Sequence, residues 1–192
     1  MLKVKLETVE NIGLHDNVFM LFDSYVEFFH CLVPFVEVGL QKNERCMIVL
    51  DDLNREDVLR NLKYLFRKGI NSIEETAKGS IVIEQFKNIY LKSGDFDLEK
   101  ILENYLGYVD LALEKDYAGL RVFVEVSSSI KEKIKPEDFI AWEKMADKYF
   151  NQVNFLAVCA YNKKYFSNEF ITQLSRIHPV EIDLINTRFL KF

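Results

Sequence analysis

Acidic residues in this sequence stand at or directly after runs that have the composition of buried strands. Asp51 and Asp52 follow the apolar run 45–50 (RCMIVL), and Glu125 lies between two valines in the run 120–126 (LRVFVEV). Adjacent carboxylates can hold a cation or activate water, and they also form solvated turns that cap the next helix. A carboxylate in a buried strand is costly to ionise unless it is paired or hydrated. Glu125 therefore either lines a site or makes a structural hydrogen bond.

Other polar and aromatic side chains follow the predicted strands in the same way. In an open parallel sheet, ligands bind beyond the carboxyl ends of the strands, near the point where the strand order reverses. We therefore expect these side chains to gather at one rim and to include the ligand-binding residues. The candidates are Asp23, Ser24, Asp51, Asp52, Tyr90, Glu125, Ser127, Tyr161 and Asn162.

The histidines and cysteines give weaker indications. His15 and His178 stand near the ends of predicted elements and could meet in space, so either is a possible switch; a lone histidine is also commonly a hydrogen-bonded structural group. The three cysteines are widely spaced, with no Cys-x-x-Cys pair and no histidine at ligand spacing. We therefore predict neither a disulfide framework nor a metal site. Cys46 and Cys159 are expected to be small buried side chains.

Short apolar runs alternate with stretches of helical periodicity along the chain. Pro34 lies inside the first helical stretch and predicts a kink or a break there. Tyr90 is expected in a loop after the third strand, and Tyr149 on the buried face of a later helix. The tail alternates around Asn186-Thr187, which predicts a C-terminal β-hairpin. The predicted strands are 17–22, 45–50, 80–84, 120–126 and 154–161, and the helices are 24–42, one from Asn54 to Gly69, one from Asp97 to Leu113, 136–150 and 167–177.

Strands separated by helices of roughly ten to twenty residues imply parallel pairing with right-handed crossovers and helices on both faces. We therefore predict a single α/β domain, residues 1–192, built as a three-layer α/β/α sandwich with a mostly parallel central sheet.

Composition and charge exclude several classes of function. The formal net charge of −5 argues against direct binding of nucleic acid, which needs a dense basic surface. The sequence contains no apolar stretch of the roughly 18 residues that span a bilayer, and its amino terminus does not resemble a signal peptide. We therefore expect a cytoplasmic protein without a membrane contact.

The segment between the first predicted strand and the first helix argues against ATP hydrolysis. A nucleoside triphosphatase of this layout has a glycine-rich loop with a lysine there, whereas this chain reads FDSYVEFFH over residues 22–30. Asp23 and Glu27 in that segment would repel a triphosphate. The sequence also lacks a Gly-x-Gly-x-x-Gly fingerprint, so we expect no nucleotide cofactor.

Several segments in order resemble the MEDS family, the methanogen and methylotroph sensory domain named partly for the dichloromethane regulator DcmR. This family is similar to RecA/KaiC-like ATPases that have lost the Walker A loop. The resemblance implies that Asp51-Asp52 fall where those ATPases carry paired glutamates and that Glu125 falls near their Walker B acid. This chain departs from the family pattern at Val124 and Asn162, where other members often have glycine and an acid. The resembling segments are His15 with the following strand, 32–52, 90–97, 117–127, 159–167 and His178-Pro179.

The resemblance implies a non-catalytic module that senses a small molecule, such as a hydrocarbon derivative or a one-carbon metabolite, and signals through a protein partner or a homo-oligomer. Such a module would have a partly apolar pocket beside Glu125 and Tyr161. Two alternatives remain open: an assembly module of RecA-like type, and a divergent nucleotide-binding protein or enzyme that uses Asp51, Asp52 and Glu125 with a divalent cation.

Overall fold

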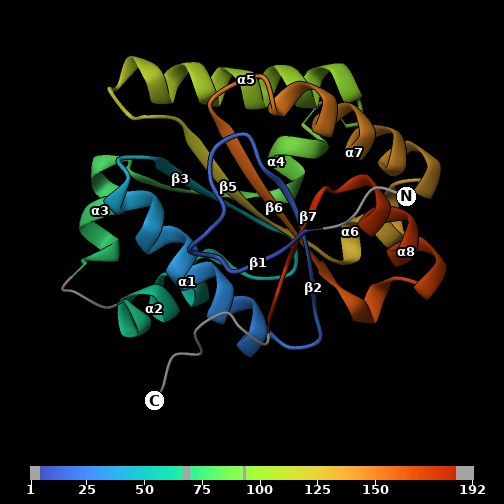
Figure 1. The fold of residues 1–192 in the computed structure, drawn as a ribbon, viewed down its shortest axis with the longest axis horizontal. Helices are drawn as coiled ribbons and strands as arrows, with labels where there is room; N and C mark the ends of the chain where they lie inside the picture. The colour runs from blue at the N-terminus through green and yellow to red at the C-terminus, as the bar shows by residue number, and fades with distance from the viewer. Residues whose placement is uncertain (1–4, 67–69, 93, 185–192) are drawn as a thin grey trace.

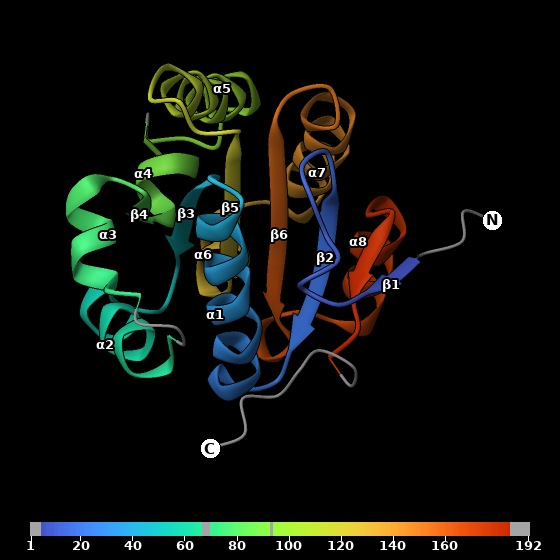
Figure 2. The same cartoon turned by 60° about the vertical axis from the view of Figure 1, so that its left-hand side comes forward.

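The protein is built on one seven-stranded sheet whose strands all run parallel. The computed structural model describes residues 5–66, 70–92 and 94–184. The strand order is β1-β7-β2-β6-β5-β3-β4, and each neighbouring pair is parallel (Figure 2). This confirms the predicted α/β class. The strands are β1 Lys5–Glu7, β2 Asn17–Phe22, β3 Arg45–Leu50, β4 Ile81–Gln85, β5 Leu120–Val126, β6 Phe155–Asn162 and β7 Val180–Ile182.

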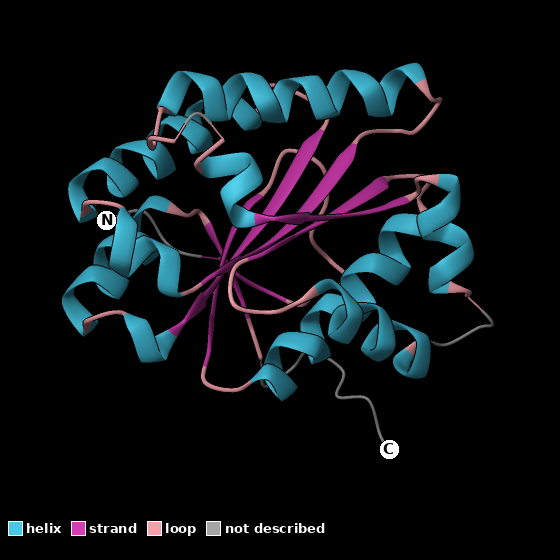
Figure 3. Ribbon diagram, turned by 180° about the vertical axis from the view of Figure 1, so that it is seen from behind, coloured by secondary structure: helices cyan, strands magenta, loops and turns pink. Residues whose placement is uncertain are grey.

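Helices cover both faces of the sheet, which gives the three-layer arrangement (Figures 1 and 3). One apolar core lies between the sheet and α1 and α2, and the other lies between the sheet and α4 to α8. Alternate residues of β5 enter opposite cores: Phe123 enters the first, and Val122 and Val124 enter the second. The helices are α1 Tyr25–Gln41, α2 Arg55–Leu65, α3 Ser72–Lys78, α4 Phe86–Tyr90, α5 Leu98–Glu114, α6 Ser128–Lys133, α7 Pro136–Phe150 and α8 Asn168–Ile177, with the 3₁₀ helix η1 at Lys163–Tyr165.

Side-chain caps explain where four of these helices begin. Ser24, Asn54, Asp97 and Ser167 each accept a hydrogen bond from the backbone N–H three residues later. All four caps stand where the sequence predicts a helix to begin. None of the described helices is both long enough and apolar enough to cross a membrane.

The structure corrects several sequence predictions. The expected break at Pro34 is wrong, because α1 continues through it with Val33, Phe35 and Val36 packed in the core. Tyr149 is 43% exposed rather than buried. Three short helices, α3, α4 and α6, were not expected. Helix α4 replaces the loop that was predicted to carry Tyr90, and α6 begins at Ser128 and Ser129. Short helices of five to seven residues give too few apolar repeats to be recognised by periodicity.

The two ends of the described chain add a pair of strands at one edge of the sheet. Part of the predicted C-terminal hairpin forms β7, which pairs in parallel with both β1 and β2. Strand β1 was not predicted. The remainder of the predicted hairpin, around Asn186-Thr187, lies outside the described residues.

Helix α1 lies very close to the sheet at Gly39. A Cβ atom at Gly39 would overlap the Cys46 Sγ atom and lie 2.8 Å from Cδ of Arg121. Arg121 is itself buried under α1, where its Nε donates to Oε2 of Glu44 at 2.6 Å and its Nη1 donates to the carbonyl of Phe35 at 3.3 Å. The absence of a side chain at Gly39 therefore makes room for a buried ion pair between Arg121 of β5 and Glu44 in the turn after α1.

Gly39→Ala should lower the free energy of unfolding by about 1–3 kcal/mol, because the new methyl group overfills a packed core around a buried ion pair. The measurement is urea denaturation at neutral pH. Gly107→Ala is the matched control, since Gly107 is a helical glycine whose Cβ would meet nothing within 4 Å; it should be neutral or stabilising by up to about 1 kcal/mol. Equal midpoints for the two variants would contradict the close approach of α1 to the sheet.

Candidate functional site

The carboxylate of Glu125 is the centre of a hydrogen-bond network at the carboxyl ends of the strands. Its side chain is fully buried at the end of β5. Oε1 accepts from the hydroxyl of Tyr25 at 2.7 Å and from the hydroxyl of Ser127 at 3.3 Å. Oε2 accepts from the backbone N–H groups of Asp51 at 3.0 Å and Leu53 at 3.1 Å. Burial raises the pKa of Glu125, and these donors oppose that shift by stabilising the ionised form.

Asp51 and Asp52 join the loop after β3 to the start of α6. Oδ2 of Asp51 accepts from the backbone N–H groups of Ser127 and Ser129, both at 3.0 Å. The carboxylate of Asp52 accepts from the Ser128 hydroxyl. Burial raises the pKa of Asp51, although its hydrogen bonds to Ser129 and Ser127 act in the opposite direction. The acidic pair therefore holds the β5–α6 turn as well as facing the rim.

Asp52 also reaches the 3₁₀ helix that follows β6. The nearby carboxylate of Asp52 raises the pKa of the Tyr165 hydroxyl to about 12. Tyr165 thereby links the ends of β3 and β6. The network around Glu125 consequently connects segments that follow β2, β3, β5 and β6.

Three other candidates lie at the outer part of this rim and are used mainly in local structure. The Asp23 carboxylate is 64% exposed and forms an ion pair with Lys163 at 3.3 Å. Ser24 caps α1 by accepting from the backbone N–H of Glu27. Asn162 caps η1 by accepting from the N–H of Lys164 at 3.2 Å. The structure thus brings Asp23, Ser24 and Asn162 to the expected end of the sheet.

Tyr161 and Tyr90 do not join the Glu125 network. Successive side chains of a strand point to opposite faces, and Tyr161 is paired in register with Val126, not with Glu125. Tyr161 therefore enters the second core, where its ring stacks on Phe19 at 5.1 Å. Tyr90 lies in the same core, with its hydroxyl 2.9 Å from that of Tyr105. The expected pocket beside both Glu125 and Tyr161 is wrong, because these residues face opposite sides of the sheet.

A cavity of about 390 Å³ opens near the same rim, between α6, η1 and α8. Its walls are largely apolar, with two charged residues at the margin, Lys131 and Glu169. Tyr165 lines the cavity and also interacts with the carboxylate of Asp52, so it lies between the cavity and the Glu125 network. The apolar wall is formed by Ile130, Ile134, Pro136, Tyr165, Phe166 and Phe170.

The two histidines proposed as switches lie in different surroundings. His15 is exposed in the turn before β2, has a positive φ of 75°, and donates its backbone N–H to the carbonyl of Phe155. His178 is buried directly after α8, with Nδ1 2.9 Å from the carbonyl of Leu174. Its Nε2 lies 3.4 Å from Oε2 of Glu143.

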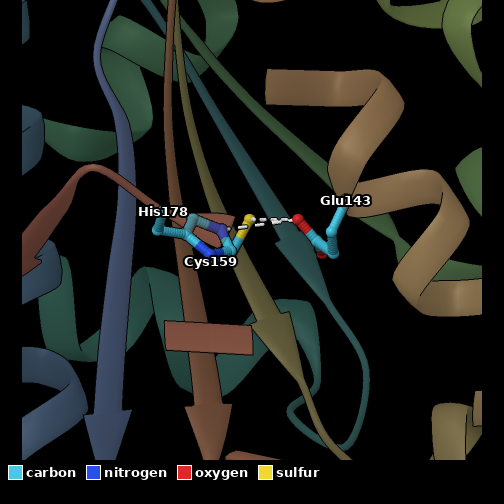
Figure 4. A group of neighbouring side chains, drawn as sticks. All are labelled: Glu143, Cys159 and His178. Atoms are coloured by element: carbon cyan, nitrogen blue, oxygen red, sulfur yellow. Dashed lines mark hydrogen bonds and ion pairs between the residues drawn. The ribbon is translucent and has the colours of Figure 1, made fainter. Parts of the chain in front are cut away.

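Glu143, Cys159 and His178 form a compact group on the side of the sheet that α4 to α8 cover (Figure 4). Sγ of Cys159 lies 3.9 Å from Oε2 of Glu143. Burial lowers the pKa of His178, but Glu143 and the Leu174 carbonyl outweigh that effect and raise it overall. Burial raises the pKa of the Cys159 thiol, and the carboxylate of Glu143 adds to that increase.

Three residues of these sites are not among the candidates selected from the sequence. Tyr25 stands in the first turn after β2, so its position at a strand end was a usable signal. Glu143 lies among the buried residues of α7, between Phe139 and Ala146, and a charged residue at such a position is also a signal. Tyr165 had no distinguishing signal, because its role depends on the turn made by η1.

Glu125→Ala should destabilise the protein by about 3 kcal/mol or more, because it leaves buried donors from three segments without an acceptor. Glu125→Gln should cost only about 1 kcal/mol, since its carbonyl can accept from the two backbone N–H groups and its amide can donate to the two hydroxyl oxygens. Chemical denaturation at neutral pH measures both. Equal losses in the two variants would contradict this account of the network.

The raised pKa of Glu125 predicts a pH-dependent difference between wild type and Glu125→Gln. An acid whose folded pKa is raised costs stability as pH rises from its ordinary value of 4.5 through the raised folded value. The unfolding free energy of the variant should therefore improve relative to wild type across that interval and then level off. Denaturation from about pH 4 to pH 8 tests this, and a relative improvement of wild type would reverse the inferred sign.

Comparison with known proteins places this geometry in a family. The family model of MEDS, described as the methanogen/methylotroph, DcmR sensory domain, matches residues 18–179. No curated protein matches the chain. One similar solved structure is the flagellar accessory protein FlaH from Methanocaldococcus jannaschii, with a TM-score of 0.60 and 13% identity over 87% of this chain and 70% of that chain. This likeness shows a RecA/KaiC-like fold. Because the family model extends from β2 to the residue before β7, the chain belongs to the MEDS family of sensory domains.

Proposed function

We propose that this protein is a non-catalytic sensory module that binds a small, largely apolar molecule in the cavity between α6, η1 and α8. The family supports a sensory role, and the cavity supports a ligand of this chemistry. Its volume of about 390 Å³ lies in the range typical of small-molecule sites. A hydrocarbon derivative of several carbons would fill this cavity better than a one-carbon metabolite.

The observation that carries the proposal is the double role of Tyr165. Tyr165 lines the cavity, while its hydroxyl interacts with the carboxylate of Asp52, which in turn accepts from Ser128 at the start of α6. Ile130 of α6 and Ile134, which directly follows this helix, also line the cavity. The first turn of α6 is held by Asp51 and Asp52. A ligand that shifts α6 or η1 would therefore change the loop after β3, and a protein partner at the rim could respond to that change.

The residues after β2 favour this reading over nucleotide hydrolysis. Residues 23–27 contain no glycine and no lysine, and both Asp23 and Glu27 carry carboxylates in that turn. The carboxylate of Glu27 accepts from the N–H of Asp23 at 2.7 Å, so it occupies a backbone donor that a phosphate would need. We propose that the protein has no nucleotide cofactor and no ATPase activity.

The proposal is tested by a thermal-shift screen of small alcohols, ketones, alkyl halides and aromatic compounds, with ATP and magnesium as a separate arm. A ligand at 100 times its dissociation constant should raise the unfolding temperature by several degrees. Gln173→Trp should abolish the shift, because Gln173 lines the cavity and the indole would fill it. Thr172→Trp, at the neighbouring exposed position of α8 outside the cavity lining, is the control and should retain it.

Hydrogen exchange then tests the coupling. Ligand should protect the amides of Asp51 and Leu53 in wild type, and Tyr165→Phe should bind the ligand without that protection. A shift with ATP and magnesium but not with apolar compounds would overturn the proposal in favour of a nucleotide-binding protein. Concentration-dependent self-association that no compound alters would overturn it in favour of an assembly module.

A further inference from the structure

We propose that Glu143, Cys159 and His178 form a buried binding site for one divalent transition metal ion of the zinc class. The three residues come from α7, β6 and the segment after α8, and each offers one ligand atom. These atoms all lie within 4.8 Å of one another. This site is separate from the proposed ligand cavity and does not depend on it.

Two of the three separations are close to those of a tetrahedral site. Zinc lies about 2.0 Å from imidazole nitrogen and carboxylate oxygen and about 2.3 Å from thiolate sulfur, which gives tetrahedral edges of about 3.3 Å for N–O and 3.5 Å for S–O. The observed distances are 3.4 Å from Nε2 of His178 to Oε2 of Glu143 and 3.9 Å from Sγ of Cys159 to the same oxygen. The third pair, Nε2 of His178 and Sγ of Cys159, lies within 4.8 Å, against a tetrahedral S–N edge of about 3.5 Å. The side chains would therefore have to close in by up to about 1 Å to hold the ion.

The orientation of His178 is that of a metal ligand. Its Nδ1 faces the carbonyl of Leu174 at 2.9 Å, which holds the proton on that nitrogen and leaves the Nε2 lone pair directed at the other two residues. Nε2 is buried and, in the described part of the chain, has no hydrogen bond of normal geometry. Leaving this nitrogen without a good hydrogen bond is costly, because the His178 side chain is only 1% exposed.

Charge and space around the group also fit a metal. The thiolate of Cys159 and the carboxylate of Glu143 together supply two negative charges, which balance a divalent ion in an apolar core. The hydroxyl of Tyr161 is buried close to Glu143 and Cys159. Within the described ranges it makes no hydrogen bond of normal geometry. A small cavity of about 10 Å³ adjoins Glu143 and Cys159, enough for about one water molecule. The fourth position can therefore be filled by that hydroxyl or by water.

Burial of all three side chains indicates a closed structural site. Metal binding would connect α7, β6 and the end of α8 more strongly than the apolar packing, the long Cys159–Glu143 hydrogen bond and the weak Glu143–His178 ion pair that join them here. Binding would release the thiol proton of Cys159, so affinity should fall at acidic pH. A mixture of sulfur, nitrogen and oxygen ligands suits zinc and cobalt better than magnesium or calcium.

The test is cobalt binding to the full chain, stripped of metal and kept reduced. One equivalent of Co²⁺ should give a thiolate-to-cobalt charge-transfer band together with tetrahedral visible bands, and excess Zn²⁺ should remove both. Cys159→Ala should lose the charge-transfer band, and Glu143→Gln should weaken Co²⁺ binding at least tenfold. Cys46→Ala, which removes another buried cysteine in a strand, is the matched control and should bind as wild type does.

Circular dichroism and thermal unfolding separate loss of metal binding from loss of folding. Circular dichroism must show that Cys159→Ala is folded; if it is not, His178→Gln replaces it, and its cobalt binding should fall at least tenfold. Zn²⁺ should also raise the unfolding temperature of wild type and the Cys46→Ala control but not that of Glu143→Gln. The proposal is overturned if folded wild type binds neither ion at micromolar concentration, or if Cys159→Ala retains the charge-transfer band.

Discussion

The arrangement of the rim depends on one buried carboxylate. Glu125 is placed at the end of a strand that is covered on both faces, so its charge must be satisfied within the protein. Four donors do this, and they come from α1, the loop after β3 and the turn after β5. Three segments that are distant in sequence are therefore held in one geometry by the need to solvate a single group.

The segments that donate to Glu125 are also joined to one another by hydrogen bonds. The Asp51 side chain holds the turn that carries Ser127, while its own backbone N–H serves Glu125. Asp52 extends the same connection to Ser128 on α6 and to Tyr165 on η1. A change at α6 would thus reach the end of β5 through hydrogen bonds, and a change at η1 would reach it through the interaction of Tyr165 with Asp52. That is the physical basis on which the proposed sensory module would report a bound molecule.

The sequence predicted much of the fold but less of the site, and the reason is physical. Long amphipathic helices and apolar strands have strong periodicity, and caps such as Asn54 and Asp97 mark helix starts directly, so the strand and helix alternation was predictable. Strand β1 and helices α3, α4 and α6 are too short for that signal. Their existence depends on tertiary contacts, such as the pairing of β1 with β7, that no local pattern contains.

The same distinction explains the site. Strand ends predicted which residues reach the rim, and Asp51, Asp52, Glu125 and Ser127 do meet there. They could not show which face of the sheet each side chain would enter. A difference of one residue in the strand register decides the face. Val126 pairs with Tyr161, so the side chains of Glu125 and Tyr161 point to opposite faces of the sheet.

The group of Glu143, Cys159 and His178 shows why sequence-spacing rules for metal ligands fail when the residues come from different elements. Those rules describe ligands that share one short loop or helix, where sequence distance limits spatial distance. Cys159 and His178 belong to different elements, and parallel pairing of β2 with both β6 and β7 brings those elements together. Glu143 then enters from the helix above them. Buried polar residues in an apolar core were the only trace of this group in the sequence, and topology alone determined that they would meet.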